Sequence, residues 1–129
     1  MPAASSIRVL VVDDQLTMRA LVRSALQQIG FTNVSEAPDG EEGLKTLITS
    51  GAQLVISDFN MPKMDGLDLL RAIRAHDATR KTAFIMLTGR SDKELVQRAI
   101  QHGVNNYLAK PFTTAALKQK IEAVFGALS

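Results

Sequence analysis

The sequence predicts an α/β fold, in which a doubly wound sheet of five parallel strands in the order 2-1-3-4-5 carries helices on both faces. Short aliphatic runs alternate strictly with amphipathic stretches along the whole chain. Parallel strands need crossover connections, and right-handed crossovers distribute the helices over both faces. Polar residues follow several of the runs, at the edge where open parallel sheets bind their ligands.

Five short apolar runs predict the strands, at 7–12, 34–37, 54–58, 83–88 and 106–109. The third run is aliphatic over its first residues, which is typical of a strand buried on both faces. The second is more polar, which suits an edge of the sheet.

Two helices are predicted in the first half of the chain. The first has one apolar stripe, and Gly30 stands where a helix C-terminal glycine belongs. Asp39 and Glu42 form a capping pair that opens the second, which ends at Gly51. Their apolar positions are Met18, Leu21, Val22, Ala25, Leu26 and Ile29, then Leu44, Leu47 and Ile48.

Three more helices are predicted in the second half. One begins near Gly66, and the next opens on a capping box of Ser91 and Glu94 and ends at His102 and Gly103. Their inward residues are Leu67, Leu70 and Ile73, then Leu95, Val96, Ala99 and Ile100, and in the closing helix Leu117, Ile121, Val124, Phe125 and Leu128.

The composition indicates one globular domain. The chain has 129 residues, of which 46% are hydrophobic and 22% charged, and we expect a folded domain over residues 7–129 after a flexible tail of residues 1–6. There is no cysteine, which excludes disulfides, thiol nucleophiles and Cys-ligated metals. No linker, internal repeat or low-complexity segment interrupts the chain.

Charge and hydropathy narrow the location and the partners. No apolar run approaches the roughly 20 residues of a membrane span and no signal peptide is evident, so we expect a cytoplasmic protein without membrane contact. A net charge of +2 without a basic, aromatic-containing run argues against nucleic-acid binding. From residue 90 onward six basic residues face three acidic ones, which favours an acidic protein partner.

Polar residues end four of the predicted strands: Asp13 and Asp14 follow the first, Asp58 ends the third, Thr88 the fourth, and Lys110 follows the fifth. In the order 2-1-3-4-5, strands one and three are neighbours at the switch point of the sheet. The three carboxylates should therefore converge in one crevice, with Thr88 and Lys110 on the same edge.

This constellation predicts phosphoryl transfer to Asp58. Three crowded carboxylates require a cation, and oxygen ligands with few protein contributors favour Mg²⁺. The acids contribute −3, and Mg²⁺ with Lys110 contributes +3, so the site can accept a phosphoryl group. A carboxylate is a covalent nucleophile toward phosphorus, and Thr88 can donate to a phosphoryl oxygen. Taken singly, Asp58, Asp14 and Thr88 have ordinary readings as turn or helix caps, and Lys110 as a solvated charge.

A set of motifs makes the chain resemble the receiver domain of two-component response regulators, and within it the stand-alone receivers of chemotaxis. The resemblance spans residues 7–128 and implies a flavodoxin-like fold. The motifs are Asp13-Asp14, Asp58 with the segment Asn60-Met61-Pro62-Lys63-Met64-Asp65-Gly66, Thr88-Gly89, and Tyr107 followed by Lys110-Pro111-Phe112.

The resemblance implies roles for single residues. Asp58 would be the phosphoacceptor, with Mg²⁺ held by the three acids and the Asn60 carbonyl, and Thr88 and Lys110 would contact the phosphoryl oxygens. A cis peptide is implied between Lys110 and Pro111. Thr88 and Tyr107 would form the switch, and the partner surface would be Lys93, Val96, Tyr107 and Lys120.

The resemblance also implies the function: a monomeric switch that is phosphorylated by a sensor histidine kinase, controlled by a phosphatase, and bound by the flagellar motor switch. It would not be a turnover enzyme. One alternative is a receiver that acts as a phosphate sink or regulates a kinase. Another is an aspartate-nucleophile phosphatase of the haloacid-dehalogenase type, but Asn60 stands where its general acid belongs and cannot protonate a leaving group.

Two positions depart from the pattern of the chemotaxis receivers. Arg90 stands where an acid is common, and Phe59 where a tryptophan is frequent, which leaves phosphoryl lifetime and motor binding open. His76 and His102 are expected on the surface without a role as phosphocarriers. The methionines at the predicted site and core, Met61, Met64 and Met86, are expected to pack rather than to take part in redox chemistry.

Overall fold

The computed structural model describes residues 2–89 and 93–129. In this part of the chain, strands and helices alternate as β1 (Arg8–Val12), α1 (Leu16–Ile29), β2 (Asn33–Ala37), α2 (Gly40–Ser50), β3 (Leu54–Asp58), α3 (Gly66–Ala75), β4 (Ala83–Thr88), α4 (Lys93–Gln101), β5 (Asn106–Ala109) and α5 (Thr114–Phe125). Among the described residues, no helix combines the length and hydropathy needed to cross a membrane.

The strands form one parallel sheet in the order β2-β1-β3-β4-β5, as the sequence predicts. Of the three internal strands, β3 and β4 are buried at every position, which explains their mainly apolar runs. The more polar β2 lies at an edge and buries only Ala37 fully. Because β1 and β3 are parallel neighbours, the residues that follow or end them lie close together at the carboxyl edge of the sheet.

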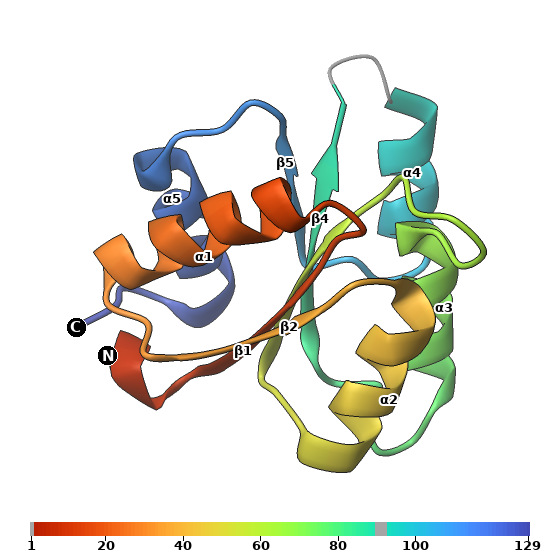
Figure 1. The fold of residues 1–129 in the computed structure, drawn as a ribbon, viewed down its shortest axis with the longest axis horizontal. Helices are drawn as coiled ribbons and strands as arrows, with labels where there is room; N and C mark the ends of the chain where they lie inside the picture. The colour runs from red at the N-terminus through yellow and green to blue at the C-terminus, as the bar shows by residue number, and fades with distance from the viewer. Residues whose placement is uncertain (1, 90–92) are drawn as a thin grey trace.

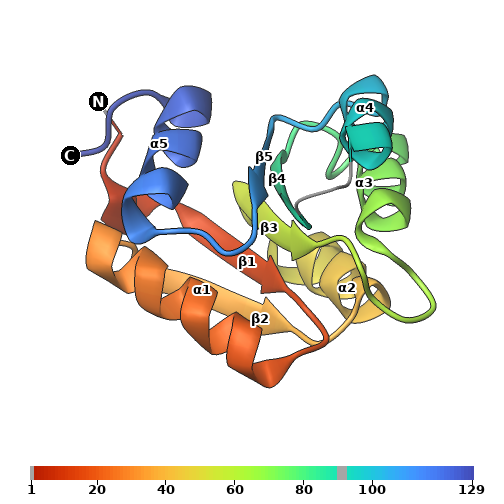
Figure 2. The ribbon, with the colours of Figure 1, turned by 90° about the horizontal axis from the view of Figure 1, so that it is seen from above.

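Helices cover both faces of the sheet. Helices α1 and α5 lie on one side, and α2, α3 and α4 lie on the other (Figures 1 and 2). Because side chains alternate along a strand, β1 serves two cores. Val9 and Val11 belong to the core under α1 and α5, while Leu10 and Val12 belong to the core under α2 to α4.

The helix ends follow the predicted capping chemistry where it is described. The Asp39 side chain accepts a hydrogen bond from the Glu42 amide at the start of α2. Gly30 and Gly51 end α1 and α2 with φ values of +121° and +76°, which side chains disfavour. A full capping box of Asp65 and Asp68, which the sequence analysis did not single out, opens α3. The predicted capping box of Ser91 lies outside the described residues.

Three positions predicted to be apolar contacts of the core are instead exposed. Leu21 is 61% exposed, Ile48 44% and Ile100 58%. Each fits the helical period of its apolar stripe, so periodicity alone could not separate these exposed positions from the buried ones. Conversely, Leu69 on α3 is fully buried although the predicted inward set omitted it.

The N-terminal segment contacts the domain from residue 2 onward, and the flexibility of residues 1–6 stays a prediction. Residues Ala4–Ser6 form a 3-10 turn, and Ala4 is packed into the core beneath α1 and α5. The Ala4 amide donates to the carbonyl of Ser129, and the Ser129 amide donates to that of Pro2. The two ends of the described chain therefore lie side by side (Figure 1), and Ala4 contributes to the packed core.

The histidines and methionines lie as predicted. His76 and His102 are exposed, and His76 follows α3, where its Nδ1 accepts a hydrogen bond from the amide of Ala78. Met86 is fully buried, and Met61 is 8% exposed. Met64 packs partly buried against the core under α2 to α4.

Candidate functional site

The carboxyl ends of the two central strands bring three acids together. Asp13 and Asp14 follow β1 directly, and Asp58 is the last residue of β3. Val12 pairs with Ser57 in the sheet register, so the strands end side by side. One oxygen from each of the three carboxylates lies within 4.8 Å of the others. The predicted convergence is therefore found.

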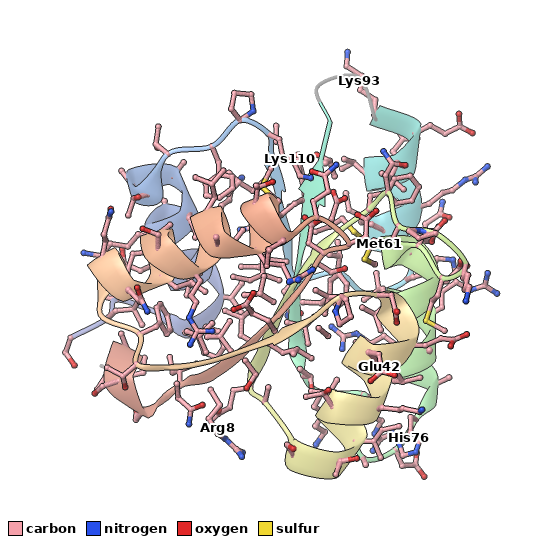
Figure 3. The ribbon with its side chains drawn as sticks, in the orientation of Figure 1. Arg8, Glu42, Met61, His76, Lys93 and Lys110 are labelled. Carbon is pink, nitrogen blue, oxygen red and sulfur yellow. The ribbon has the colours of Figure 1, made fainter. Side chains whose placement is uncertain are left out.

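Lys110 reaches this cluster from the end of β5. Its Nζ lies 2.6 Å from Asp58 Oδ1 and 3.9 Å from Asp13 Oδ2. The Lys110 amide donates to the carbonyl of Thr88 at 2.8 Å, which ties the residue to the end of β4. The peptide bond to Pro111 is cis, as the resemblance implies. Figure 3 shows Lys110 and Lys93 toward one end of the molecule, with Arg8 and His76 at the opposite end.

The three acids differ in their exposure to solvent. Asp13 is 1% exposed and Asp58 7%, whereas Asp14 is open to solvent. Burial raises the pKa of the Asp13 carboxyl above its ordinary value of 3.8, and the negative charge of Asp58 acts in the same direction. A hydrogen bond from the Gln15 amide and the charge of Lys110 oppose that shift.

The donor set suits a hard cation. Asp13 Oδ1 accepts a hydrogen bond from the Gln15 amide at 2.9 Å, but among the described residues Asp13 Oδ2 has no hydrogen-bond partner. An orphaned, buried carboxylate oxygen beside two further carboxylates is a ligand set that Mg²⁺ prefers. Asn60 lies two residues beyond Asp58 and is exposed; its carbonyl as a further ligand stays a prediction.

Asp14 does not cap α1, which was its ordinary reading. The residue before the helix is Gln15, and its side chain forms no capping hydrogen bond. The acid pair is therefore not explained by helix capping. The carboxylate of Asp14 instead belongs to the cluster with Asp13 and Asp58.

The predicted switch residues lie on neighbouring strands. Thr88 is buried at the end of β4. Tyr107 on β5 pairs with Met86 of β4, which precedes Thr88 by two residues. The Tyr107 ring is 39% exposed, and the Nζ of Lys120 lies 5.1 Å from its centroid. The ring is thus at the surface, and the inward swing toward Thr88 stays a prediction.

A groove of about 380 Å³ joins the switch residues to the predicted partner surface. It is lined by Thr88, Gly89, Lys93, Val96, Gln97, Ile100, Tyr107 and Ala109. Three of the four predicted surface residues lie in it, and Lys120 contacts one of them through the Tyr107 ring. Ile100, which is exposed, forms part of the wall of this groove. Arg90, the predicted gatekeeper, lies outside the described residues.

Sequence reasoning missed residues that hold the acids in place. The Gln15 amide fixes one oxygen of Asp13, and the guanidinium of Arg19 donates to the main-chain carbonyl of Asp13. Gly66 packs so tightly that a Cβ there would lie 2.5 Å from the carbonyl oxygen of Asp58. The sequence analysis did not identify these residues, because Gln15 acts through its main-chain amide, Arg19 binds a main-chain carbonyl, and Gly66 acts through the side chain that it lacks.

Comparison with known proteins agrees with the fold. The chain belongs to the response regulator receiver family: the family model described as the response regulator receiver domain matches residues 9–122. This family assignment confirms the resemblance seen in the sequence motifs.

Individual relatives are similar along their whole length. A probable chemotaxis protein CheY of Rhizobium etli is 56% identical, over 99% of each chain. The NMR structure of the BeF3-activated response regulator CheY2 with Mg²⁺ from Sinorhizobium meliloti is 57% identical, with full coverage of both chains and a TM-score of 0.75. Chemotaxis protein CheY4 of Vibrio cholerae is 32% identical over 96% of this chain and 99% of its own, with a TM-score of 0.84.

Proposed function

We propose that the protein is a phosphorylation-controlled switch in chemotaxis, in which Asp58 accepts a phosphoryl group from the phosphohistidine of a sensor kinase. The observation that carries the proposal is the contact of 2.6 Å between Asp58 Oδ1 and Lys110 Nζ, beside the orphaned oxygen of Asp13. A nearly buried carboxylate held by a lysine, next to an acid pair that needs a cation, is suited to phosphoryl chemistry. The chemotaxis role is supported by the names of the similar proteins.

In the proposed reaction, one oxygen of Asp58 attacks phosphorus and forms an O–P bond while the N–P bond of the phosphohistidine breaks. The electron pair of that bond stays on the imidazole nitrogen, which takes up a proton. Lys110 would move from its ion pair with Asp58 to an oxygen of the arriving group, and the Thr88 hydroxyl would donate to another. Water later hydrolyses the acyl phosphate and restores the Asp58 carboxylate. Because the acceptor is a residue of the protein itself, the protein would act as a switch rather than turn over an external substrate.

Asp13, Asp14, Asp58 and the carbonyl of Asn60 would hold Mg²⁺ in this site. When bound, the ion neutralises charge on the phosphoryl oxygens and helps to orient them. Asp13 contributes one oxygen because the Gln15 amide occupies the other. The contribution of few carboxylates predicts weak binding in the absence of phosphate.

The output would pass from Thr88 to Tyr107. Phosphorylation changes Asp58 from −1 to about −2 and adds acceptors that Thr88 can approach. Movement of Thr88 would leave space that the Tyr107 ring can fill, which would reshape the groove between α4 and β5. The basic and apolar groove, with Lys93 and Val96 in its lining, suits an acidic amphipathic segment of a flagellar motor switch protein.

Phosphorylation is tested by incubating the protein with Mg²⁺ and acetyl phosphate and measuring its intact mass. The wild type is expected to gain one phosphoryl group that acid and base both remove, and Asp58→Asn should abolish the gain. Asp77→Asn, a matched change of an exposed acid after α3, should leave it intact. A stable gain that survives Asp58→Asn would show that another residue is the nucleophile.

The motor role is tested separately from phosphorylation. Binding to a purified flagellar switch protein is measured with and without beryllofluoride, a mimic of the phosphoryl group. Binding that depends on the mimic supports the switch. Phosphorylation without mimic-dependent binding would favour the phosphate-sink role instead.

A further inference from the structure

Asp13 has four atoms that can form hydrogen bonds, and three of them are bonded to other residues of the protein. Its amide donates to the carbonyl of Ala37 at 3.2 Å, at the end of the edge strand β2. Its Oδ1 accepts from the Gln15 amide, and its carbonyl accepts from Arg19 Nη1 at 2.7 Å. The atom left over is Oδ2, which lies 3.9 Å from Lys110 Nζ and lacks a hydrogen-bond partner among the described residues.

Arg19 is in turn anchored by the edge strand. Its Nε donates to Glu36 Oε1 at 3.2 Å, and Arg23 Nη1 lies 2.8 Å from Glu36 Oε2. The Arg19 side chain is 15% exposed, against 41% for Arg23. The guanidinium of Arg19 therefore bridges β2 and the end of β1, because its Nε binds Glu36 and its Nη1 binds the Asp13 carbonyl. The planar guanidinium holds its donors in a fixed arrangement, so little conformational entropy is lost for each hydrogen bond.

The carbonyl that Arg19 holds belongs to the peptide between Asp13 and Asp14. Fixing that peptide plane sets the direction in which both consecutive side chains leave the backbone. Glu36 pairs with both Arg19 and Arg23, so a loss of positive charge is common to substitutions of either arginine, whereas the hydrogen bond to the Asp13 carbonyl is made by Arg19. Arg23 shares the glutamate but has no recorded bond to Asp13, which makes it a matched control.

We propose that Arg19, held by Glu36, is a positioning residue for the cation site, because it fixes the Asp13–Asp14 peptide from which two of the three carboxylates project. This inference rests on the proposed function in one respect, namely that the acids bind Mg²⁺. Residues that orient metal ligands typically contribute about 10–100-fold to metal affinity. Arg19→Gln should therefore weaken Mg²⁺ binding about tenfold.

The experiment measures Mg²⁺ affinity by NMR titration of the metal-free protein in four forms: wild type, Arg19→Gln, Arg19→Lys and Arg23→Gln. Lysine keeps the charge but cannot bridge two acceptors, so Arg19→Lys should bind nearly as weakly as Arg19→Gln. Arg23→Gln should stay within about twofold of wild type, since it removes a comparable charge without touching the peptide. At saturating Mg²⁺ the phosphorylation rate of Arg19→Gln should recover.

A second measurement needs no metal. Hydrogen exchange of the Gln15 amide should accelerate in Arg19→Gln, because the Asp13 carboxylate that accepts it is no longer fixed. The Glu42 amide, bonded in the same manner to Asp39 at α2, should exchange at the wild-type rate. Glu36→Gln, which keeps Arg19 but loosens it, should show an intermediate change and serves if Arg19→Gln does not fold.

The outcomes separate this inference from the function on which it rests. Wild-type protein that binds no Mg²⁺ would overturn both. Wild-type binding with unchanged affinity in Arg19→Gln would overturn the positioning role alone. Full affinity in Arg19→Lys would also overturn it, because charge rather than the bridging geometry would then account for the effect.

Discussion

Replacing Asp13 by asparagine should stabilise the metal-free protein. The carboxylate is 1% exposed, one of its oxygens lacks a hydrogen-bond partner among the described residues, and Asp58 lies beside it. Asparagine removes the charge and keeps an oxygen in place to accept the hydrogen bond from Gln15. The substitution therefore removes an unfavourable interaction without creating a cavity.

The magnitude follows from the orphaned oxygen. A buried polar group without a partner costs about 1–3 kcal/mol, and Lys110, 3.9 Å from that oxygen, offsets part of the cost. We expect the free energy of unfolding to rise by about 1–2 kcal/mol, which corresponds to an increase in Tm of about 3–6 °C. Asp14→Asn is the matched control: it removes a charge from the same cluster at an exposed position and should change stability by less than about 0.5 kcal/mol.

Mg²⁺ should reduce or reverse the stability advantage that Asp13→Asn has over the wild type without metal. A ligand that binds only the folded state stabilises it by RT ln(1 + [L]/Kd), which is about 1.4 kcal/mol at a concentration tenfold above Kd. The wild type gains this stabilisation, whereas Asp13→Asn has lost a charged ligand and gains little. Titrating Mg²⁺ should therefore narrow the difference between the two melting temperatures.

The pH dependence has a definite sign. Burial raises the pKa of Asp13 in the folded protein, so its ionisation weakens the wild type as pH rises through that pKa. The advantage of Asp13→Asn should be full above the raised pKa of Asp13 and should shrink as the pH falls through that pKa toward the ordinary value of 3.8, because the wild-type carboxyl then takes up its proton. Urea unfolding of both proteins across this range, without metal, is the assay. A variant that is less stable than wild type at pH 7 without Mg²⁺ would refute the reasoning.

Three further predictions concern the surroundings of the acids. Gly66→Ala should cost about 2 kcal/mol of stability in thermal unfolding, since its Cβ would lie 2.5 Å from the carbonyl oxygen of Asp58; unchanged stability would contradict the tight packing. Thr88→Ala should leave mass gain from acetyl phosphate intact but remove the response of the Tyr107 ring to beryllofluoride in NMR spectra, and an undiminished response would disprove their coupling. From the sequence alone, Arg90→Glu should shorten the phosphorylated state's lifetime, because it restores the acid that is common at this position in chemotaxis receivers; equal decay rates would exclude a role of Arg90 in the lifetime.

The sequence alone determined the sheet, its order and the edge on which the polar residues meet. These features depend on local signals: aliphatic runs of strand length, helical spacing between them, and acids placed directly after Val12 and at the end of the third run. Handed crossovers then leave few topologies, and the order β2-β1-β3-β4-β5 follows. The acid cluster was predictable for this reason, because strand ends are recognisable from the chain itself.

Which helical residues face the core was only partly predictable. Leu21, Ile48 and Ile100 fit the helical period of their apolar stripes, yet the structure leaves them exposed. Periodicity specifies the direction in which a side chain points. How far the neighbouring layer extends to meet it is a property of the packed structure.

The tertiary structure alone decided how the adjacent acids differ. Asp13 and Asp14 are equivalent in sequence, yet one is buried with an orphaned oxygen and the other is exposed. Asp13 is tied to the edge strand because its amide donates to the carbonyl of Ala37, which lies far from it in sequence, while its carbonyl is held by Arg19 on α1. Hydrogen bonds between segments distant in sequence leave no local pattern, so the environment of each acid emerges only when the sheet and α1 have packed together.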